Sequence, residues 1–217
     1  MSDFPITLRK GTGKLGVVFF HDITGLDPVN LAFADKLAQE GIWVAAVDLF
    51  RGHLVKDVQE GMALRQKLTP DELTNAARFG LARLQKEMGA GAVIGTMGFC
   101  MGGGVALHGA CHAEFAFVVD YYGMIANVDD VAALRGPVLL ILASEDDRIN
   151  PWAYGQLLPK MDEHRKRLHV ELYPAVAHPF HRPDWIVTPF SGAKSYDEKA
   201  AGDAWARAVA FIREQAR

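Results

Sequence analysis

The sequence has 217 residues, of which 50% are hydrophobic and 23% are charged, values typical of one globular domain with a sizeable core. They exclude a disordered or fibrous chain. The formal net charge is −3 and no basic block interrupts the sequence, so nucleic acid is not an expected partner. No apolar run approaches the roughly 20 residues of a membrane-spanning helix, so we expect a cytoplasmic protein without signal peptide or membrane contact. We expect the protein to be a monomer or a weak dimer.

Apolar runs of strand length alternate with longer helical patterns along the whole chain. Most of these runs are continuously apolar, as expected for parallel strands that are covered on both faces. The alternation predicts one α/β domain over residues 1–217, with a mostly parallel, doubly wound sheet flanked by helices and sites at the carboxyl ends of the strands. The expected strands are residues 15–20, 42–47, 92–99, 115–121, 138–142 and 168–173.

Start and stop signals place helices between these strands. Asp27 followed by Pro28 predicts a helix that ends before Gly41. Thr69 and Glu72 form a capping box that opens a helix running to about residue 87. Further helices are expected at residues 101–112, 152–163 and 196–215.

The most informative stretch is the end of the strand at residues 92–99, where the chain reads G-x-C-x-G from Gly98 to Gly102. In the related pattern G-x-S-x-G the reactive residue lies on a strained strand-to-helix turn, and the glycines allow close backbone approach. The helix that follows would favour a Cys100 thiolate, and the Met101 N–H would face a developing oxyanion. The pattern predicts that Cys100 is a nucleophile; the alternative is a small buried hydrophobic residue.

The remaining cysteine and the serines do not offer a second nucleophile. Cys111 lacks such a turn and is expected in the core as a free thiol, because eleven helical residues would hold it about 16 Å from Cys100, too far for a disulfide. No serine stands in a G-x-S-x-G context, which excludes a serine hydrolase. The serines are Ser2, Ser144, Ser191 and Ser195.

A cysteine nucleophile needs a base and a group that orients the base. In α/β-hydrolases these follow in the order nucleophile, acid, histidine. The chain has acidic residues after the strand at 138–142 and histidines after the strand at 168–173, at Glu145, Asp146, Asp147, His178 and His181.

The chain resembles the dienelactone hydrolase family of α/β-hydrolases from about Gly16 to the C-terminal helix. The resemblance implies an α/β-hydrolase fold, no cofactor, and hydrolysis of small activated esters or lactones through a thioester acyl-enzyme. The matching segments are HDITGL at 21–26, VAAVDLF at 44–50, GFCMGG at 98–103, DYYG at 120–123, DRINP at 147–151 and AHPFHR at 177–182.

The resemblance also assigns catalytic roles. It implies a triad of Cys100, His178 as general base and Asp147 as carboxylate, because the family's aspartate stands four residues before a proline, here Pro151. The backbone N–H of Ile23 would be the second oxyanion donor, beside that of Met101.

Further residues are implied for substrate binding and activation. Arg182 occupies the place of a family arginine that pairs with a substrate carboxylate, and Arg51 and Arg65 are candidates for a second one. Asp22 stands where the family has a glutamate that helps to activate the cysteine, and it is expected to take that role. Tyr122 and Phe180 are expected to contact the substrate.

Two features leave other functions open. His108 and His112 share one helix face at i, i+4, but without an HExxH motif or a third ligand at suitable spacing we interpret them as packing or surface histidines and predict no metal. The alternative function is a non-hydrolytic thiol redox or ligand-binding protein on the same fold.

Overall fold

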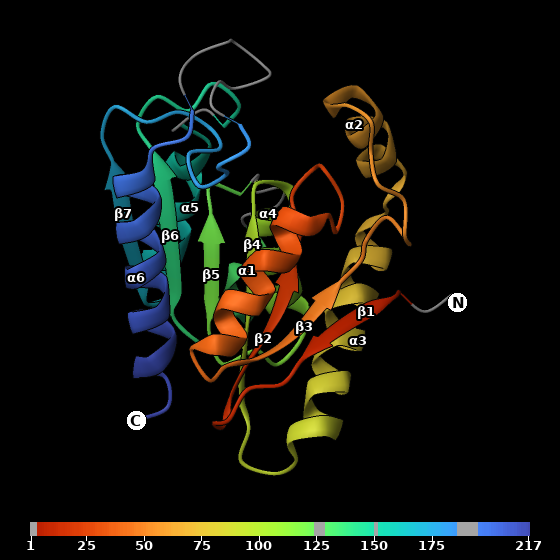
Figure 1. Ribbon diagram of the computed structural model, residues 1–217. Helices are drawn as coiled ribbons and strands as arrows, with labels where there is room; N and C mark the ends of the chain where they lie inside the picture. The colour runs from red at the N-terminus through yellow and green to blue at the C-terminus, as the bar shows by residue number, and fades with distance from the viewer. Residues whose placement is uncertain (1–3, 124–128, 150–151, 186–194) are drawn as a thin grey trace.

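The sheet has seven strands in the order β1-β3-β2-β4-β5-β6-β7 (Figure 1). This computed structural model describes residues 4–123, 129–149, 152–185 and 195–217. Only β1 runs antiparallel to its neighbour, β3, among the strands described; the other neighbours pair in parallel. The strands are β1 Ile6–Arg9, β2 Leu15–Phe20, β3 Trp43–Val47, β4 Val93–Phe99, β5 Val118–Tyr121, β6 Val138–Ala143 and β7 Leu168–Tyr173.

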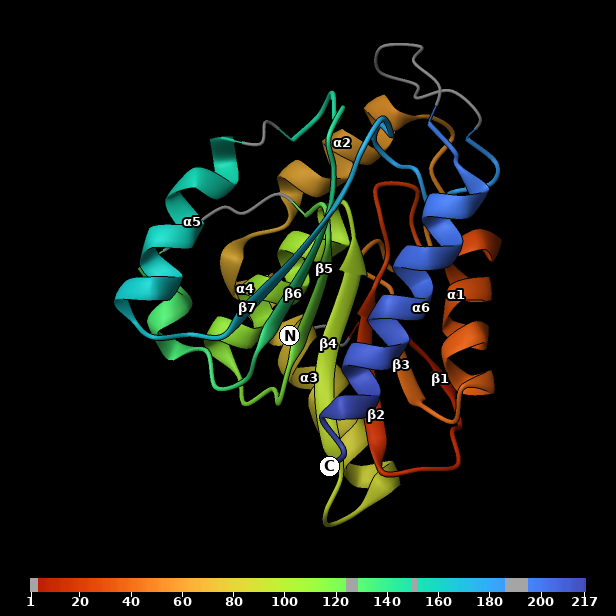
Figure 2. The same ribbon diagram turned by 90° about the vertical axis from the view of Figure 1, so that its left-hand side faces the viewer.

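Helices cover both faces of this sheet (Figure 2). Two of them, α1 (Pro28–Gln39) and α6 (Glu198–Glu214), pack on one face, and the others lie on the opposite face. The others are α2 (Val58–Lys67), α3 (Pro70–Met88), α4 (Met101–His112), α5 (Trp152–Glu163) and the short 3-10 helix η1 (Asp129–Ala133). In the described ranges, no helix has the length and apolarity needed to span a membrane.

The predicted doubly wound α/β architecture is confirmed, and so are the helix start signals. Asp27 caps α1 by accepting a hydrogen bond from the Asn30 backbone, and Thr69 and Glu72 form the capping box of α3. The last helix begins at Glu198, two residues later than predicted, with Asp197 as its N-cap.

The sequence analysis missed β1, α2 and the short helix η1. Both β1 and α2 have a weak hydrophobic pattern. The four residues of β1 are all half-buried, since this strand forms the edge of the sheet. In α2 the only fully buried residue is Gly61, so the helix carries almost no apolar stripe.

The core determines where the functional groups gather. All six residues of β2 are buried, and two hydrophobic clusters lie on the two sides of the sheet. Because the strands from β3 to β7 run parallel, their carboxyl ends meet at one edge, the upper edge in Figure 1. The loops that follow β2, β4, β6 and β7 therefore come together there.

Candidate active site

Cys100 is the single residue between β4 and α4. Its φ of 53° and ψ of −119° lie in a region that side-chain-bearing residues rarely adopt, so the turn is strained. Two backbone hydrogen bonds hold it: the Cys100 N–H donates to the Tyr121 carbonyl at 2.9 Å, and the Gly103 N–H donates to the Cys100 carbonyl at 3.0 Å. The predicted strand-to-helix elbow is therefore present.

The glycines on either side of Cys100 make this turn possible. A Cβ on Gly98 would lie 2.1 Å from the Gly102 carbonyl oxygen, and a Cβ on Gly102 would lie 2.2 Å from the carbonyl oxygen of Phe20 in β2. Both distances are far below van der Waals contact, and the clashing atoms belong to the backbone. The G-x-C-x-G pattern thus reflects close approach of α4 to β4 and β2.

His178, in the loop after β7, hydrogen-bonds the Cys100 side chain and is 1% exposed. Its Nδ1 lies 3.0 Å from Asp146 Oδ2. Burial alone would lower the pKa of His178, but its electrostatic interaction with Cys100 and the hydrogen bonds with Asp146 and Cys100 raise it to about 10. These interactions favour the protonated, imidazolium form of His178.

The expectation that Asp147 would be the carboxylate beside the histidine is wrong. Asp147 is exposed, whereas the Asp146 side chain is 3% exposed and contacts His178. Asp146 Oδ1 also accepts hydrogen bonds from the backbone N–H groups of Arg148 and Ile149, each at 2.8 Å. This local turn directs the Asp146 side chain inward. The family spacing to a proline selected Asp147, the neighbour of the aspartate that contacts His178.

Ile23 and Met101, the two expected oxyanion donors, line the same cavity as Cys100. Met101 is the first residue of α4, so its N–H has no acceptor within the helix. Ile23 follows β2, and both residues line the cavity that contains Cys100. Neighbouring His21 holds the Ile23 loop: its Nε2 accepts the Leu49 N–H at 3.0 Å and its Nδ1 donates to the Asp22 carbonyl at 2.6 Å.

The cavity itself has a volume of about 630 Å³ and lies between α2, α3, α4 and the loop after β6. Its wall is mostly apolar, with Leu73 and Val105 among the lining residues. Two arginines, Arg65 and Arg148, also line it. Both the size and the lining suit a small organic substrate.

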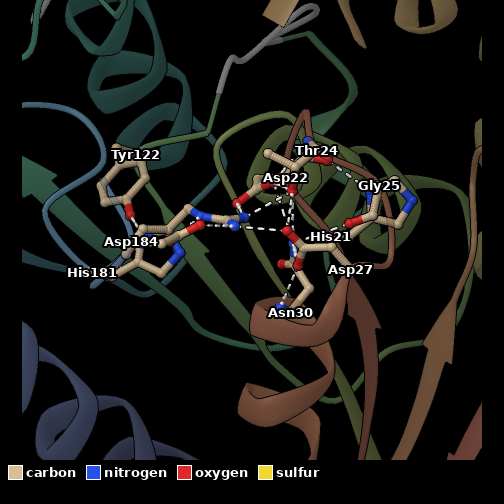
Figure 3. Close-up of polar contacts among 10 residues, drawn as sticks. His21, Asp22, Thr24, Gly25, Asp27, Asn30, Tyr122, His181 and Asp184 are labelled. Atoms are coloured by element: carbon tan, nitrogen blue, oxygen red, sulfur yellow. Dashed lines mark hydrogen bonds and ion pairs between the residues drawn. The ribbon is translucent and has the colours of Figure 1, made fainter. Parts of the chain in front are cut away.

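Arg182 lies outside this cavity, in a buried charge cluster whose acidic members, Asp22, Asp27 and Asp184, are labelled in Figure 3. Its guanidinium is 1% exposed and pairs with Asp22 at 2.7 Å, Asp27 at 2.7 Å and Asp184 at 2.8 Å. The Arg182 Nη1 also donates to Thr24 Oγ1 at 2.8 Å. Side chains of the protein bind the guanidinium of Arg182 in this structure, so its expected contact with a substrate carboxylate stays a prediction.

The same cluster determines the charge state and the hydrogen bonds of Asp22. Burial would raise the pKa of Asp22, but the charge of Arg182 outweighs it and lowers that pKa to about 2. The carboxylate accepts hydrogen bonds from Thr24, Asn30 and Arg182, and within the described residues none comes from Cys100. The expected activation of the cysteine by Asp22 is therefore not supported by these contacts.

Tyr122 and Phe180 pack around His178 and are not among the residues that line the cavity, so their expected contact with the substrate stays a prediction. Tyr122 is 1% exposed and packs edge-on against His178 at 4.7 Å between ring centroids. Phe180 is fully buried between Tyr122 and Tyr173. These rings hold the imidazole in place by packing.

His181 is a second buried histidine and packs among the same aromatic side chains. Its ring stacks on Phe99 with centroids 4.0 Å apart, and its Nδ1 bonds the Tyr122 hydroxyl. Burial lowers the pKa of His181 to about 3. The ring is therefore neutral in the folded protein at pH values where an unfolded histidine is already charged.

This difference predicts a pH dependence of stability. The unfolded chain takes up a proton at position 181 near pH 6.5 and the folded chain does not, so this contribution is present above pH 6.5 and lost as the pH falls towards 3. Between these pH values, uptake of this one proton changes the free energy of unfolding by about 1.4 kcal/mol per pH unit. In urea unfolding at pH 4.5, 5.5 and 7.5, we expect His181→Gln to lose less stability per pH unit than the parent. The difference in unfolding free energy between parent and variant at pH 7.5 measures the effect of the substitution that does not depend on pH. If the unfolding free energies of both proteins fall equally with pH, the prediction is contradicted.

Comparisons with known proteins point to one family. A model of the dienelactone hydrolase family matches residues 6–216. A Xenopus tropicalis protein named carboxymethylenebutenolidase homolog is 29% identical over 184 residues, covering 80% of this chain and 73% of that protein. The solved structure titled m3DLH is 25% identical, with a TM-score of 0.83, and covers 95% of this chain and 87% of its own.

A second solved structure extends the likeness in fold. It is a dienelactone hydrolase-like promiscuous phosphotriesterase from metagenomic libraries, 19% identical with a TM-score of 0.83, covering 97% of this chain and 98% of its own. The fold is thus shared beyond clear sequence identity. Since the family match spans nearly the whole sequence, the chain belongs to the dienelactone hydrolase family and is a hydrolase of carboxylic esters or lactones.

Proposed function

We propose that the protein hydrolyses small activated esters or lactones through a triad of Cys100, His178 and Asp146. One observation carries this proposal. Cys100 lies at a strained elbow and is hydrogen-bonded to His178, and His178 is hydrogen-bonded to the buried carboxylate of Asp146. This is the nucleophile, base and orienting group that covalent acyl transfer needs.

The reaction has two steps. In the first, the Cys100 thiolate attacks the acyl carbon, a thioester forms, and the His178 imidazolium gives its proton to the leaving oxygen. In the second, neutral His178 takes a proton from water, the hydroxide attacks the thioester, and the carboxylic acid leaves as the thiolate returns. The N–H groups of Ile23 and Met101 would stabilise the oxyanion in both steps.

A thiol nucleophile favours activated acyl groups. A thiolate is readily expelled from the tetrahedral intermediate unless the other leaving group is also good, as in an enol lactone. The relatives named as carboxymethylenebutenolidase homologs support such lactones as substrates.

Charge in the cavity suggests how a substrate carboxylate would be held. Arg182 is bound by the carboxylates of its cluster, so we assign binding of the substrate carboxylate to Arg65, which is half-buried in the cavity wall. Arg51 does not line the cavity, and it pairs with Glu72 at 3.0 Å. A single guanidinium can bind a carboxylate through two hydrogen bonds.

The mechanism also suggests a compartment. Both cysteines are free thiols, and the proposed activity depends on a reduced Cys100. A reducing compartment such as the cytoplasm preserves that state.

The test is hydrolysis of a substrate panel by the parent and by Cys100→Ala. The panel contains p-nitrophenyl acetate, cis- and trans-dienelactone and a simple saturated lactone. We expect Cys100→Ala to remove turnover while its circular dichroism spectrum stays unchanged, because the substitution removes only the attacking sulphur. Retained turnover would reject the cysteine mechanism.

The same panel tests substrate choice. Faster turnover of the dienelactones, which carry a carboxylate, than of the neutral lactone supports recognition by Arg65. Activity on neutral esters alone would keep the triad and reject carboxylate recognition. Peroxide oxidation of Cys100 without turnover of any ester would instead support the redox alternative.

A further inference from the structure

The end of the cavity remote from Cys100 holds three groups that can bind a metal ion. His108 and His112 lie one turn apart on α4, and Asp130 comes from η1. One ring nitrogen of each histidine and one carboxylate oxygen of Asp130 lie within 4.8 Å of one another. All three residues are half-buried and line the cavity.

The surroundings already orient both imidazoles. His112 Nδ1 donates to the His108 carbonyl at 2.9 Å, so Nε2 carries the lone pair, and this Nε2 lies 3.7 Å from Asp130 Oδ2. His108 Nε2 lies 2.9 Å from Thr74 Oγ1 and 3.2 Å from the Pro70 carbonyl. Histidines that bind metals characteristically use one nitrogen for such a bond to the protein and the other for the ion.

The spacing requires only a small adjustment. Ligands of a tetrahedral zinc ion, each about 2.0–2.1 Å from the metal, lie roughly 3.4 Å apart. The His112 to Asp130 distance of 3.7 Å is already close to that value. The ligand atoms lie within 4.8 Å of one another, so shifts of at most about 1.4 Å in these half-buried side chains would bring them to the spacing of a zinc site.

We propose that His108, His112 and Asp130 bind a divalent transition metal ion, with Zn²⁺ as the preferred ion, in the wall of the substrate cavity. Two imidazoles and one carboxylate are a donor set that suits Zn²⁺, and three protein ligands leave a fourth position for water or an anionic ligand. Because all three ligands line the cavity, we expect that position to face it. The site is separate from the nucleophile, since eight residues of α4 place His108 about 12 Å along the helix from Cys100.

The experiment measures Zn²⁺ binding by isothermal titration calorimetry in the Cys100→Ala background, where no catalytic thiolate can bind the ion. We compare Cys100→Ala alone with the same protein carrying His112→Gln, Asp130→Asn or His169→Gln. His169 is exposed on β7 and provides a matched histidine substitution outside the cavity. Circular dichroism confirms that each variant is folded.

We expect one Zn²⁺ per chain in Cys100→Ala, at least tenfold weaker binding with His112→Gln or Asp130→Asn, and unchanged binding with His169→Gln. Co²⁺ in the same protein should give the visible absorption of a four-coordinate site, and that absorption should disappear with His112→Gln. The proposal is overturned if Cys100→Ala binds no Zn²⁺, or if His112→Gln binds it as tightly as its parent. Neither result depends on ester hydrolysis.

Discussion

Replacing Asp146 by asparagine should lower kcat/KM for ester hydrolysis by about 10³- to 10⁴-fold, the loss typical of a triad carboxylate. The Asp146 carboxylate lies 3.0 Å from His178 Nδ1, and its charge helps to raise the pKa of that imidazole. An amide at this position cannot stabilise the imidazolium and can hold the ring in the wrong tautomer. Steady-state kinetics with p-nitrophenyl acetate, together with a thermal melt, measure the effect.

The neighbouring residue provides the control. Asp147→Asn makes the same change one position along, at a side chain that is exposed. We expect Asp147→Asn to stay within a fewfold of the parent in kcat/KM. If Asp147→Asn loses the activity and Asp146→Asn keeps it, the assignment from geometry is wrong and the family spacing is right.

Replacing Arg182 by methionine should destabilise the fold by about 3–5 kcal/mol, as expected when one partner of a buried ion pair is removed. The substitution keeps an unbranched side chain but leaves the buried carboxylate of Asp22 without its cation. The pKa of Asp22 should then rise from about 2, because burial favours the neutral acid. Urea unfolding at pH 7 measures the loss of stability.

Arg207→Met is the matched control for this second prediction. Arg207 pairs with two carboxylates, those of Asp203 at 2.8 Å and Glu171 at 3.1 Å, but unlike Arg182 it is half exposed on α6. Its removal should change the free energy of unfolding by only a small fraction of the Arg182 effect, since solvent screens surface pairs. Equal losses in both variants would refute the special role of the buried cluster.

Sequence patterns predicted the elements with strong local signals and failed where those signals are weak. The elbow could be predicted because a positive φ and two close backbone approaches demand glycines around Cys100. By contrast, β1 and α2 carry little buried apolar surface, so their periodicity is faint. These two segments owe their structure to pairing and packing with the rest of the fold.

The sequence by itself determined the family, the parallel sheet, the elbow at Cys100 and the histidine loop, because each depends on residues close together in the chain. Only the tertiary structure decided which carboxylate meets His178, since Asp146 and Asp147 have the same chemistry and differ only in direction.

The tertiary structure also decided what the charged groups bind. Arg182 had the position of a substrate ligand, but Asp22 and Asp27, more than 150 residues away in sequence, occupy its guanidinium. Likewise His108 and His112 lacked a third ligand in the helical pattern, and η1 brings Asp130 to them. Burial requires the charge of Arg182 to find partners. In both cases the partners come from segments that only folding brings together.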